Sequence, residues 1–484
     1  MPNSKIQKSL PKSVSKLLRV LDKNPNDLNA NKMLGQYFVE IGDYEKSLLY
    51  FSTALLSSQD AENYYNLGVS LHHTKKIDDA LVMYDECINL NPKFAEAYSN
   101  RAAIYREKYN FPEALSNYVK AIELKPQKID EYLNFAVVLF NLSKFEDALD
   151  ICNYTISKEG ISERKLLFKC ETLFILGRLD EVQECLNTLT NKFPKSPKVL
   201  WANACNDLLH GNFETGWQLY ESRWLAELGL KEYKLNKPKW LGDFSIEGLT
   251  LLVHTEQGLG DTIHFCRYVK ELKPFKAKVI FLVQPQLFEL LKDLDDTVQV
   301  SVLGGSEPLP EFDAHIPLLS LPLALKTTEL SIPNTIPYLY PSPYKSSYWR
   351  DKFSQSEFNG FRVGLVWNGG FRRELINEHA RNERRNISVD LLQNLREVNA
   401  KFFSLQKGEP AESELKTKLG SWNGPEIINL MDEVHDFTDT AAIIDQLDLV
   451  ISVDTSTAHL AGALGKKVWL LNRVDSCWRW IHNR

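Results

Sequence analysis

The sequence predicts a multidomain chain in which an all-α array of stacked helical hairpins precedes an α/β region of two doubly wound parallel sheets that face a cleft. Three observations predict this fold class. The 484-residue chain is long enough for about three domains. Its first half repeats with a period of about 34 residues. Its second half alternates short β-rich apolar runs with helical stretches.

The repeats are visible as small residues at fixed spacing, with a second small residue and then an aromatic or apolar side chain later in each unit. Small residues let two antiparallel helices approach closely, and prolines at the ends of some units stop the second helix. The first small positions are Gly35, Gly68, Ala102, Ala136, Cys170 and Ala204. We therefore predict about six repeats over residues 28–230, preceded by a helical cap over residues 1–27.

Three asparagines, Asn66, Asn100 and Asn134, occupy the same position in consecutive repeats. Stacked hairpins would align them on the concave face, where a side-chain amide can both donate to and accept from an extended peptide backbone. They are candidate residues for binding an extended peptide. The alternative is that asparagine is simply common at this position of the repeat.

The repeat period ends after "GNFETGWQLYESRW", and residues 231–248 have the composition of a linker. Apolar runs then predict strands, with "LTLLVH", "AKVIFLV" and "VQVSVL" in one half and "FRVGLVW", "KFFSLQ", "DLVISVD" and "KKVWLLN" in the other. We expect one parallel-sheet domain over residues 249–345 and a second over residues 346–484. Ligands bind at the carboxyl ends of parallel strands, so the motifs at those ends are the candidate site.

The first motif is "EQGLGDTIHF", in which Gly258 and Gly260 permit a tight strand-to-helix turn and a close backbone approach. Ile263 replaces the third glycine of a dinucleotide fingerprint, and the ending of a P-loop is absent. The spacing alone favours two roles for Asp261 equally. It can cap the helix, which would stabilise the fold by about 1 kcal/mol, or it can act as a general base.

The second motif is "DTSTAH", where a buried strand runs into Asp454 and the residues Thr455, Ser456 and Thr457 open a short helix. Free amides, hydroxyls and the positive helix end suit a diphosphate without any metal. Ordinary capping of the helix is the alternative for the hydroxyls. His459 lies one turn into the helix, where it can equally contact a ligand or support the core.

Two further segments carry cations that suit phosphate oxygens. In "WNGGFRRELINEHARNERRNIS" the glycines Gly369 and Gly370 indicate a loop, and five arginines follow, although a run of charges is often only a solvated face. These arginines are Arg372, Arg373, Arg381, Arg384 and Arg385. In "SLQKGE", Gln406 and Lys407 stand at another strand end.

Composition excludes several classes of protein. The chain has 57 Lys plus Arg against 63 Asp plus Glu, which argues against a strongly basic nucleic-acid surface. Its start lacks a secretory leader and no apolar run is long enough to span a membrane, so we expect a soluble cytoplasmic protein. The seven cysteines form no CxxC pair, so neither a disulfide framework nor a zinc site is indicated.

The hairpin array resembles tetratricopeptide repeats, and its asparagines resemble the peptide-holding ladder of O-GlcNAc transferase. Together with "HTEQGLGDTIHFCRYV", "RVGLVWNGGFRR", "FFSLQKGE" and "DLVISVDTSTAHLAGALGKKVW", the chain over about residues 28–482 is similar to bacterial proteins that join such repeats to a heptosyltransferase-like glycosyltransferase domain. The resemblance implies a GT-B architecture and inverting, metal-independent transfer from a nucleotide sugar. It also implies that the first Rossmann-like half binds the acceptor and the second binds the donor.

Carried over by position, the resemblance makes Asp261 the catalytic base. It puts Asp454, Thr455, Ser456 and His459 in the donor site. It also places Arg384 or Arg385, and Lys407, near the donor phosphates.

With an anion site in the second half, we favour Asp261 as the base, and we expect the array to recruit a protein acceptor. We expect no metal and no cofactor besides the nucleotide-sugar co-substrate. Two alternatives stay open: a non-catalytic scaffold with a degenerate transferase domain, and an enzyme acting on a glycan or lipid. The resemblance implies a chain that continues well past the "WRW" at residues 478–480, so we expect this chain either to be a fragment or to close its cleft less well.

Overall fold

The computed structural model describes residues 11–128, 130–226, 228–230, 232–305, 308–354, 360–370, 383–419 and 423–481. Arg372, Arg373 and Arg381 lie outside these described residues. The chain divides into two compact units, Met1–Leu173, here called the array unit, and Phe174–Arg484, here called the sheet unit. No helix among the described residues is both long and apolar enough to cross a membrane.

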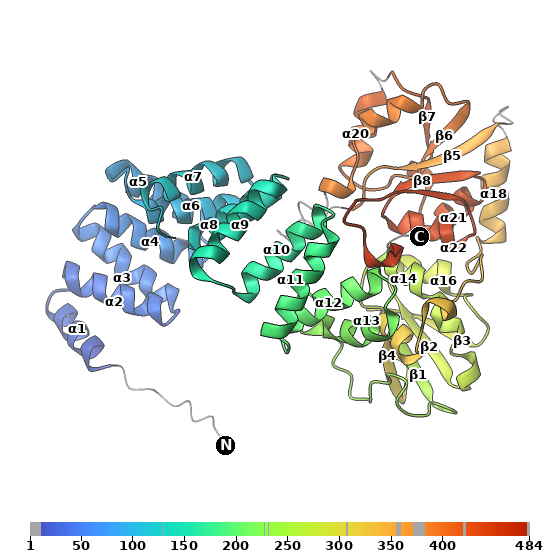
Figure 1. The fold of residues 1–484 in the computed structure, drawn as a ribbon, viewed down its shortest axis with the longest axis horizontal. Helices are drawn as coiled ribbons and strands as arrows, with labels where there is room; N and C mark the ends of the chain where they lie inside the picture. Colours follow the sequence, from blue (N-terminus) through green and yellow to red (C-terminus); the bar gives the residue numbers. More distant parts are fainter. Residues whose placement is uncertain are drawn as a thin grey trace. The chain divides into compact units, whose positions relative to one another are not determined.

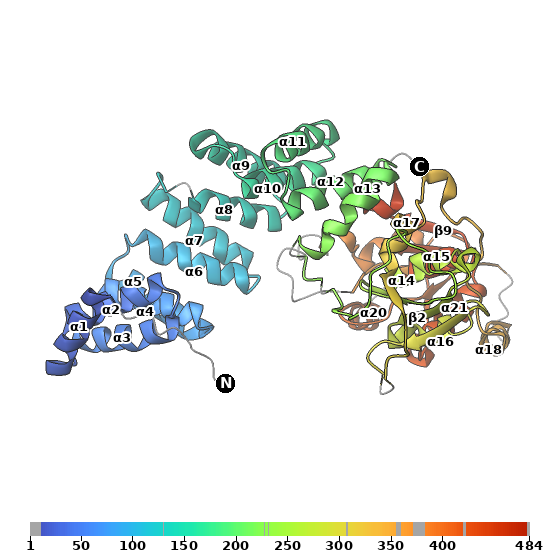
Figure 2. The same ribbon diagram turned by 90° about the horizontal axis from the view of Figure 1, so that it is seen from below.

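The array unit consists of helices that pair as antiparallel hairpins, α2 with α3, α4 with α5, α6 with α7 and α8 with α9, which confirms the predicted helical repeats (Figure 2). Its helices are α1 (Lys12–Lys23), α2 (Leu28–Glu40), α3 (Tyr44–Ser57), α4 (Ala61–His73), α5 (Ile77–Leu90), α6 (Ala95–Glu107), α7 (Phe111–Leu124), α8 (Asp130–Asn141), α9 (Phe145–Glu159) and α10 (Glu163–Ile175), the last of which crosses the boundary between the units.

Close packing explains the glycine in the first helix of the hairpins α2–α3 and α4–α5. A Cβ atom on Gly35 would lie 2.5 Å from the Phe51 ring, and one on Gly68 would lie 2.7 Å from the Tyr84 ring. Both rings are almost completely buried. The aromatic residue of the second helix therefore occupies the space that a side chain on the first helix would need.

The sheet unit begins with α11 (Leu179–Lys192), α12 (Pro197–Leu209), α13 (Phe213–Tyr220) and the short helix η1 (Glu221–Trp224). The predicted array extends to residue 230, whereas these helices belong to the compact unit that contains the sheets. One cluster of buried apolar side chains runs from Trp217 in α13 through the first sheet to the second. The predicted linker is packed as well, since Trp240 is buried and its backbone N–H donates to the His315 carbonyl at 2.9 Å.

Two parallel sheets with helices follow, which confirms an α/β region (Figure 1). The first contains β1 (Thr250–His254), β2 (Lys278–Val283), β3 (Val298–Val302) and β4 (Ala314–Pro317) in the order β3-β2-β1-β4. The second contains β5 (Phe361–Val366), β6 (Ala400–Ser404), β7 (Ile427–Asn429), β8 (Leu449–Val453) and β9 (Val468–Leu471) in the order β7-β6-β5-β8-β9. All seven strands predicted from apolar runs are present, and β4 and β7 are additional.

The helices of the sheet unit include α14 (Leu259–Phe265), α15 (Arg267–Lys270), α16 (Pro285–Leu291), α17 (Leu321–Ala324), α18 (Pro343–Ser354), α20 (Ala411–Leu419), α21 (Phe437–Asp445), α22 (Ser456–Ala463) and the short helix η8 (Trp478–Trp480). Each sheet reverses its strand order once, between β1 and β4 in the first and between β5 and β8 in the second. Such switch points are where open α/β sheets bind ligands. Helix α14 follows β1, α22 follows β8, and these two helices are in contact between the sheets (Figure 1). The two switch points therefore face each other.

Candidate functional site

Asp261 is the third residue of α14, and both of its carboxylate oxygens have partners. Oδ2 accepts a hydrogen bond from the backbone N–H of Gly258 at 3.0 Å, which is the capping interaction. Oδ1 lies 2.5 Å from Nη2 of Arg479, and the Asp261 side chain is 18% exposed. The cap that the spacing suggested is therefore present, and an ion pair that it did not suggest occupies the other oxygen.

Gly260 stands where α14 meets the start of α22. A Cβ atom at this position would lie 3.0 Å from Cδ2 of His459 and 3.3 Å from Cα of Ser456. Because Gly260 lacks a side chain, the residue beside Asp261 can touch the first turn of the helix that carries the predicted anion site. This is the close backbone approach that the glycines of the first motif indicated.

His459 lies at the centre of the contact between the two helices. Its Nδ1 is 3.2 Å from Nδ1 of His264 on α14, and its ring stacks on Trp480 with centroids 4.9 Å apart. Burial lowers the pKa of His459, although the nearby carboxylates of Asp454 and Asp261 oppose this shift. Burial and the His459 ring also hold the pKa of His264 well below its ordinary value. Both rings are therefore neutral near pH 7, and one can donate to the other.

Thr455 is the residue before α22, and its hydroxyl accepts from the backbone N–H of Ala458 at 3.4 Å. The Thr455 hydroxyl therefore caps the helix, which was the alternative to a role in binding an anion. Ser456 and Thr457 are the first two residues of the helix, and Thr457 is buried. The carboxylate of Asp454 is 3.8 Å from Nε2 of His459. The second motif therefore meets the first motif at the start of α22.

Two of the described cations predicted to bind phosphate, Lys407 and Arg384, have partners in the segments around the second sheet. Lys407 donates to the carbonyl oxygens of Met431 at 3.1 Å and Val434 at 2.6 Å. Arg384 pairs with Asp475 at 3.1 Å. These contacts stabilise the loops at the carboxyl ends of the strands.

The loop after β5 is held by its own polar groups. Arg385 donates to the carbonyl oxygen of Gly370 at 2.7 Å, and a Cβ atom on Gly369 would lie 2.5 Å from Cζ of Arg385. Gln406 accepts from the backbone N–H of Asn368 at 3.0 Å and donates to its carbonyl at 2.9 Å. Glycine at position 369 therefore makes room for the Arg385 side chain.

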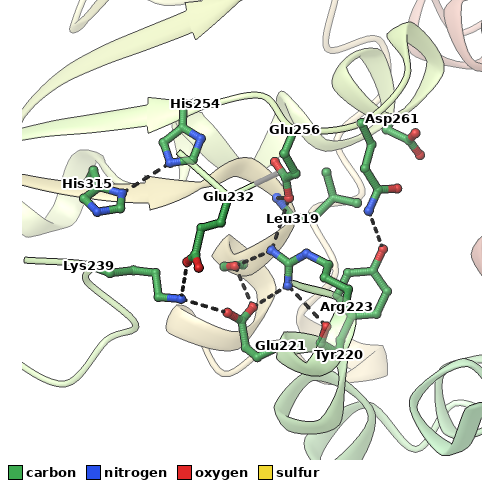
Figure 3. A network of polar contacts seen from close by, with 12 residues as sticks. Tyr220, Glu221, Arg223, Glu232, Lys239, His254, Glu256, Asp261, His315 and Leu319 are labelled. Carbon is green, nitrogen blue, oxygen red and sulfur yellow. Dashed lines mark hydrogen bonds and ion pairs between the residues drawn. The ribbon is translucent and has the colours of Figure 1, made fainter. Parts of the chain in front are cut away.

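A buried charge cluster under β1 was not predicted from the sequence. Arg223 is completely buried and donates to Glu221 at 2.6 Å, to Glu256 at 3.2 Å and to Ser320 at 2.7 Å (Figure 3). Burial raises the pKa of Glu256 to about 7, although the Arg223 guanidinium opposes the shift. Three members of the cluster lie in segments quoted for other reasons, Glu221 and Arg223 in "ESRW" and Glu256 at the start of "EQGLGDTIHF".

Two buried histidines form a pair at the end of β1. His254 and His315 approach to 3.2 Å between ring nitrogens, and burial together with His315 lowers the pKa of His254 to about 3 (Figure 3). A cavity of about 560 Å³ next to this pair is lined by Glu232, Tyr233, Lys239 and His315, among others. Asp261 does not line this cavity, which is therefore separate from the contact between α14 and α22.

A chain of hydrogen bonds connects α13 to Asp261. The Tyr220 hydroxyl accepts from Nε2 of Gln257 at 3.0 Å, and Oε1 of Gln257 accepts from Nη2 of Arg479 at 3.0 Å. Nη2 of Arg479 also makes the ion pair with Asp261. Gln257 and Arg479 were not predicted as site residues, although the quoted "WRW" contains the arginine.

The three asparagines lie on the first helices of successive hairpins, α4, α6 and α8. Asn100 donates to the Tyr65 hydroxyl at 3.3 Å, and Oδ1 of Asn134 accepts from Arg164 at 3.0 Å. Nδ2 of Asn66 is buried and has no hydrogen-bond partner among the described residues. Asn100 and Asn134 thus connect neighbouring first helices, which is consistent with a shared face.

Comparison with known proteins identifies the repeats. Residues 61–94 match the family model of the tetratricopeptide repeat. The protein FlbA of Caulobacter vibrioides is 27% identical over 310 residues, which cover 58% of this chain and 50% of that protein. The chain thus spans about half the length of this curated relative.

Two solved structures are also similar to part of the chain. The crystal structure of MamA is 22% identical, covers 30% of this chain and 86% of its own, and has a TM-score of 0.29. A structure of Pseudomonas aeruginosa pilF is 18% identical, covers 38% of this chain and 86% of its own, and has a TM-score of 0.34. Together with the helical hairpins, the match over residues 61–94 makes the N-terminal part of the chain a tetratricopeptide-repeat array.

Proposed function

We propose that the protein is an inverting glycosyltransferase of the GT-B type, which moves a sugar from a nucleotide-sugar donor to a protein recruited by the array. One observation carries this proposal: Asp261, after β1, directly follows Gly260, and Gly260 touches the start of α22, after β8, at the junction of two facing switch points. A carboxylate on one side and a helix start on the other are what such a transfer needs.

The residues would divide the chemistry between the two sheets. Asp261 would accept the proton of the acceptor hydroxyl as that oxygen attacks the anomeric carbon from the face opposite the leaving group. The amides at the start of α22 would stabilise the charge that develops on the departing diphosphate. His264 on α14 and His459 on α22 contact each other at 3.2 Å and so join the two helices that carry these groups.

The acceptor would be a polypeptide bound by the array unit. Asn66, Asn100 and Asn134 lie on the first helices of three successive hairpins. Side-chain amides in this arrangement can accept from the N–H groups and donate to the C=O groups of an extended backbone. The repeats themselves are of a class that serves as an interaction scaffold.

The experiment measures donor binding and turnover separately. We expect one or more nucleotide sugars of a panel to raise the melting temperature of the full chain, since bound ligand stabilises by RT ln(1 + [L]/Kd). The wild type should also release nucleoside diphosphate and incorporate labelled sugar into protein. Asp261→Asn should abolish turnover and keep the thermal shift, whereas Asp390→Asn, at an exposed aspartate of the same unit, should leave both unchanged. Unchanged turnover of Asp261→Asn would remove the base assignment.

A non-catalytic scaffold is the second candidate, and one observation favours it. Both oxygens of Asp261 are engaged, by the Gly258 amide and by Arg479, so neither is open to an acceptor hydroxyl in this conformation. If no nucleotide or nucleotide sugar stabilises the wild type and no turnover is detected, the scaffold is the correct function.

A further inference from the structure

The short helix η8 places its three residues into the contact between α14 and α22. Trp478 packs against Trp217 and Tyr220 of α13, with ring centroids 5.3 Å and 5.4 Å apart, and against Phe265 of α14 at 6.1 Å. Trp478 is itself buried. Aromatic packing on three sides therefore fixes the position of the arginine that follows it.

Arg479 is a nearly buried cation with donors to spare. Its side chain is only 11% exposed, and its guanidinium lies 4.4 Å from the centre of the Trp478 ring. Burial disfavours the charged form of Arg479, but the Asp261 carboxylate outweighs this and holds the pKa of Arg479 well above its ordinary value. Nε of Arg479 is buried and has no hydrogen-bond partner among the described residues. A guanidinium has five N–H donors, so this group can take a further acceptor.

The residues next to Arg479 reach the first turn of α22. Trp480, the next residue, stacks on His459 in the first turn of that helix, and its Nε1 is also buried without a partner in the part of the chain that the structure describes. Asp261, the partner of Arg479, directly follows Gly260, which touches Ser456. Both neighbours of Arg479, Asp261 through Gly260 and Trp480 through His459, therefore connect it to the first turn of α22.

Two of the other candidate cations among the described residues have partners elsewhere. Lys407 donates to two backbone carbonyls, and Arg384 pairs with Asp475. Arg479, by contrast, comes from a segment that the sequence assigned to no ligand, and it is held at the junction of both sheets.

We propose that Arg479 is a diphosphate-binding residue: it takes the diphosphate group of a nucleotide at the start of α22, with Asp261 as its partner while the site is empty. The inference rests on the proposed function, because it identifies a ligand of the same donor site. A planar guanidinium can bind two phosphate oxygens at once, and its attraction is strong where little water is present. Transfer of Arg479 to the diphosphate would also release Oδ1 of Asp261 for the acceptor hydroxyl.

The test measures binding of UDP, GDP, ADP and CDP to the full chain by calorimetry, which needs neither acceptor nor turnover. With the nucleotide that binds, Arg479→Gln should weaken the affinity about ten- to a hundred-fold, which is the usual effect of removing a hydrogen bond to a charged group. The nucleotide affinity of Arg479→Lys should lie between those of Arg479→Gln and the wild type. Arg396→Gln, at an exposed arginine of the second sheet domain, is the matched control and should bind as the wild type does.

Removing Arg479 alone leaves Asp261 without its counter-ion, so folding needs its own control. The double variant Asp261→Asn, Arg479→Gln removes both charges and should show the same loss of affinity, with a melting temperature close to that of the wild type without ligand. If the double variant binds the nucleotide as tightly as the wild type, Arg479 is not a diphosphate ligand, and the proposed function stands. If the wild type binds none of the four nucleotides, both the inference and the proposed donor site are wrong.

Discussion

Replacing Gly260 with alanine tests the contact on which the candidate site depends. The new Cβ atom would lie 3.0 Å from Cδ2 of His459 and 3.3 Å from Cα of Ser456. The His459 ring cannot easily give way, because Trp480 stacks on it and His264 contacts its Nδ1. The Ser456 atom belongs to the backbone.

Two effects of this change oppose each other. Gly→Ala raises helix propensity by at most about 1 kcal/mol. Overpacking a tight contact costs about 1–3 kcal/mol. Since both contacts at Gly260 are with atoms that are held in place, overpacking should win, with a net loss of about 1–2 kcal/mol in the free energy of unfolding.

Thermal denaturation followed by circular dichroism measures this loss, at roughly 2–4 °C per kcal/mol. Gly462→Ala is the matched control: Gly462 lies within α22, and a Cβ atom there would have nothing within 4 Å. We expect Gly462→Ala to raise the melting temperature and Gly260→Ala to lower it. If both variants raise it equally, α14 and α22 do not meet as described, and the site built on that contact is refuted.

Two further predictions concern the array and the buried acids and bases. Gly68→Ala should lower the melting temperature of the array unit through an overpacking cost of about 1–3 kcal/mol, because its Cβ atom would lie 2.7 Å from the Tyr84 ring; a stabilised variant would contradict the hairpin packing. His254 has a folded-state pKa of about 3 against 6.5 ordinarily, so the unfolded chain binds the extra proton and stability falls as the pH falls from about 6.5 to 3. Glu256 has a folded-state pKa of about 7 against 4.5, so the folded chain binds the extra proton and stability falls as the pH rises from about 4.5 to 7. Urea denaturation across this pH range should show the first slope lost in His254→Phe and the second lost in Glu256→Gln, and slopes unchanged by these variants would show that other groups cause them.

Much of the fold could be predicted because it leaves a periodic trace in the chain. Small residues such as Gly68 recur with the period of a hairpin, since each hairpin needs the same close approach to an aromatic ring. Buried parallel strands appear as apolar runs, because both faces of the sheet are covered. The strands that were missed, β4 and β7, have only 4 and 3 residues, and each contains a polar residue, His315 or Asn429, so no apolar run marks them.

The site was predicted only where its chemistry lies within one short segment. The motif around Asp261 and the motif from Asp454 to His459 each combine a strand end, a turn and a helix start, so their positions follow from local sequence. That the two motifs meet also follows in outline, since carboxyl ends of strands in two facing sheets border one crevice. The sequence also left open whether Asp261 caps its helix, and the Gly258 amide shows that it does.

The sequence by itself determined the repeat array, most strands of the two parallel sheets, and the segments that supply charged groups to their carboxyl ends. Only the tertiary structure decided which charges pair: Arg479 with Asp261, and Arg223 with Glu221 and Glu256. The physical reason is that an ion pair depends on the distance between atoms in space and imposes no spacing on the chain. Gln257 and Arg479 lie 222 residues apart in sequence and 3.0 Å apart in the fold, so no local pattern could record their contact.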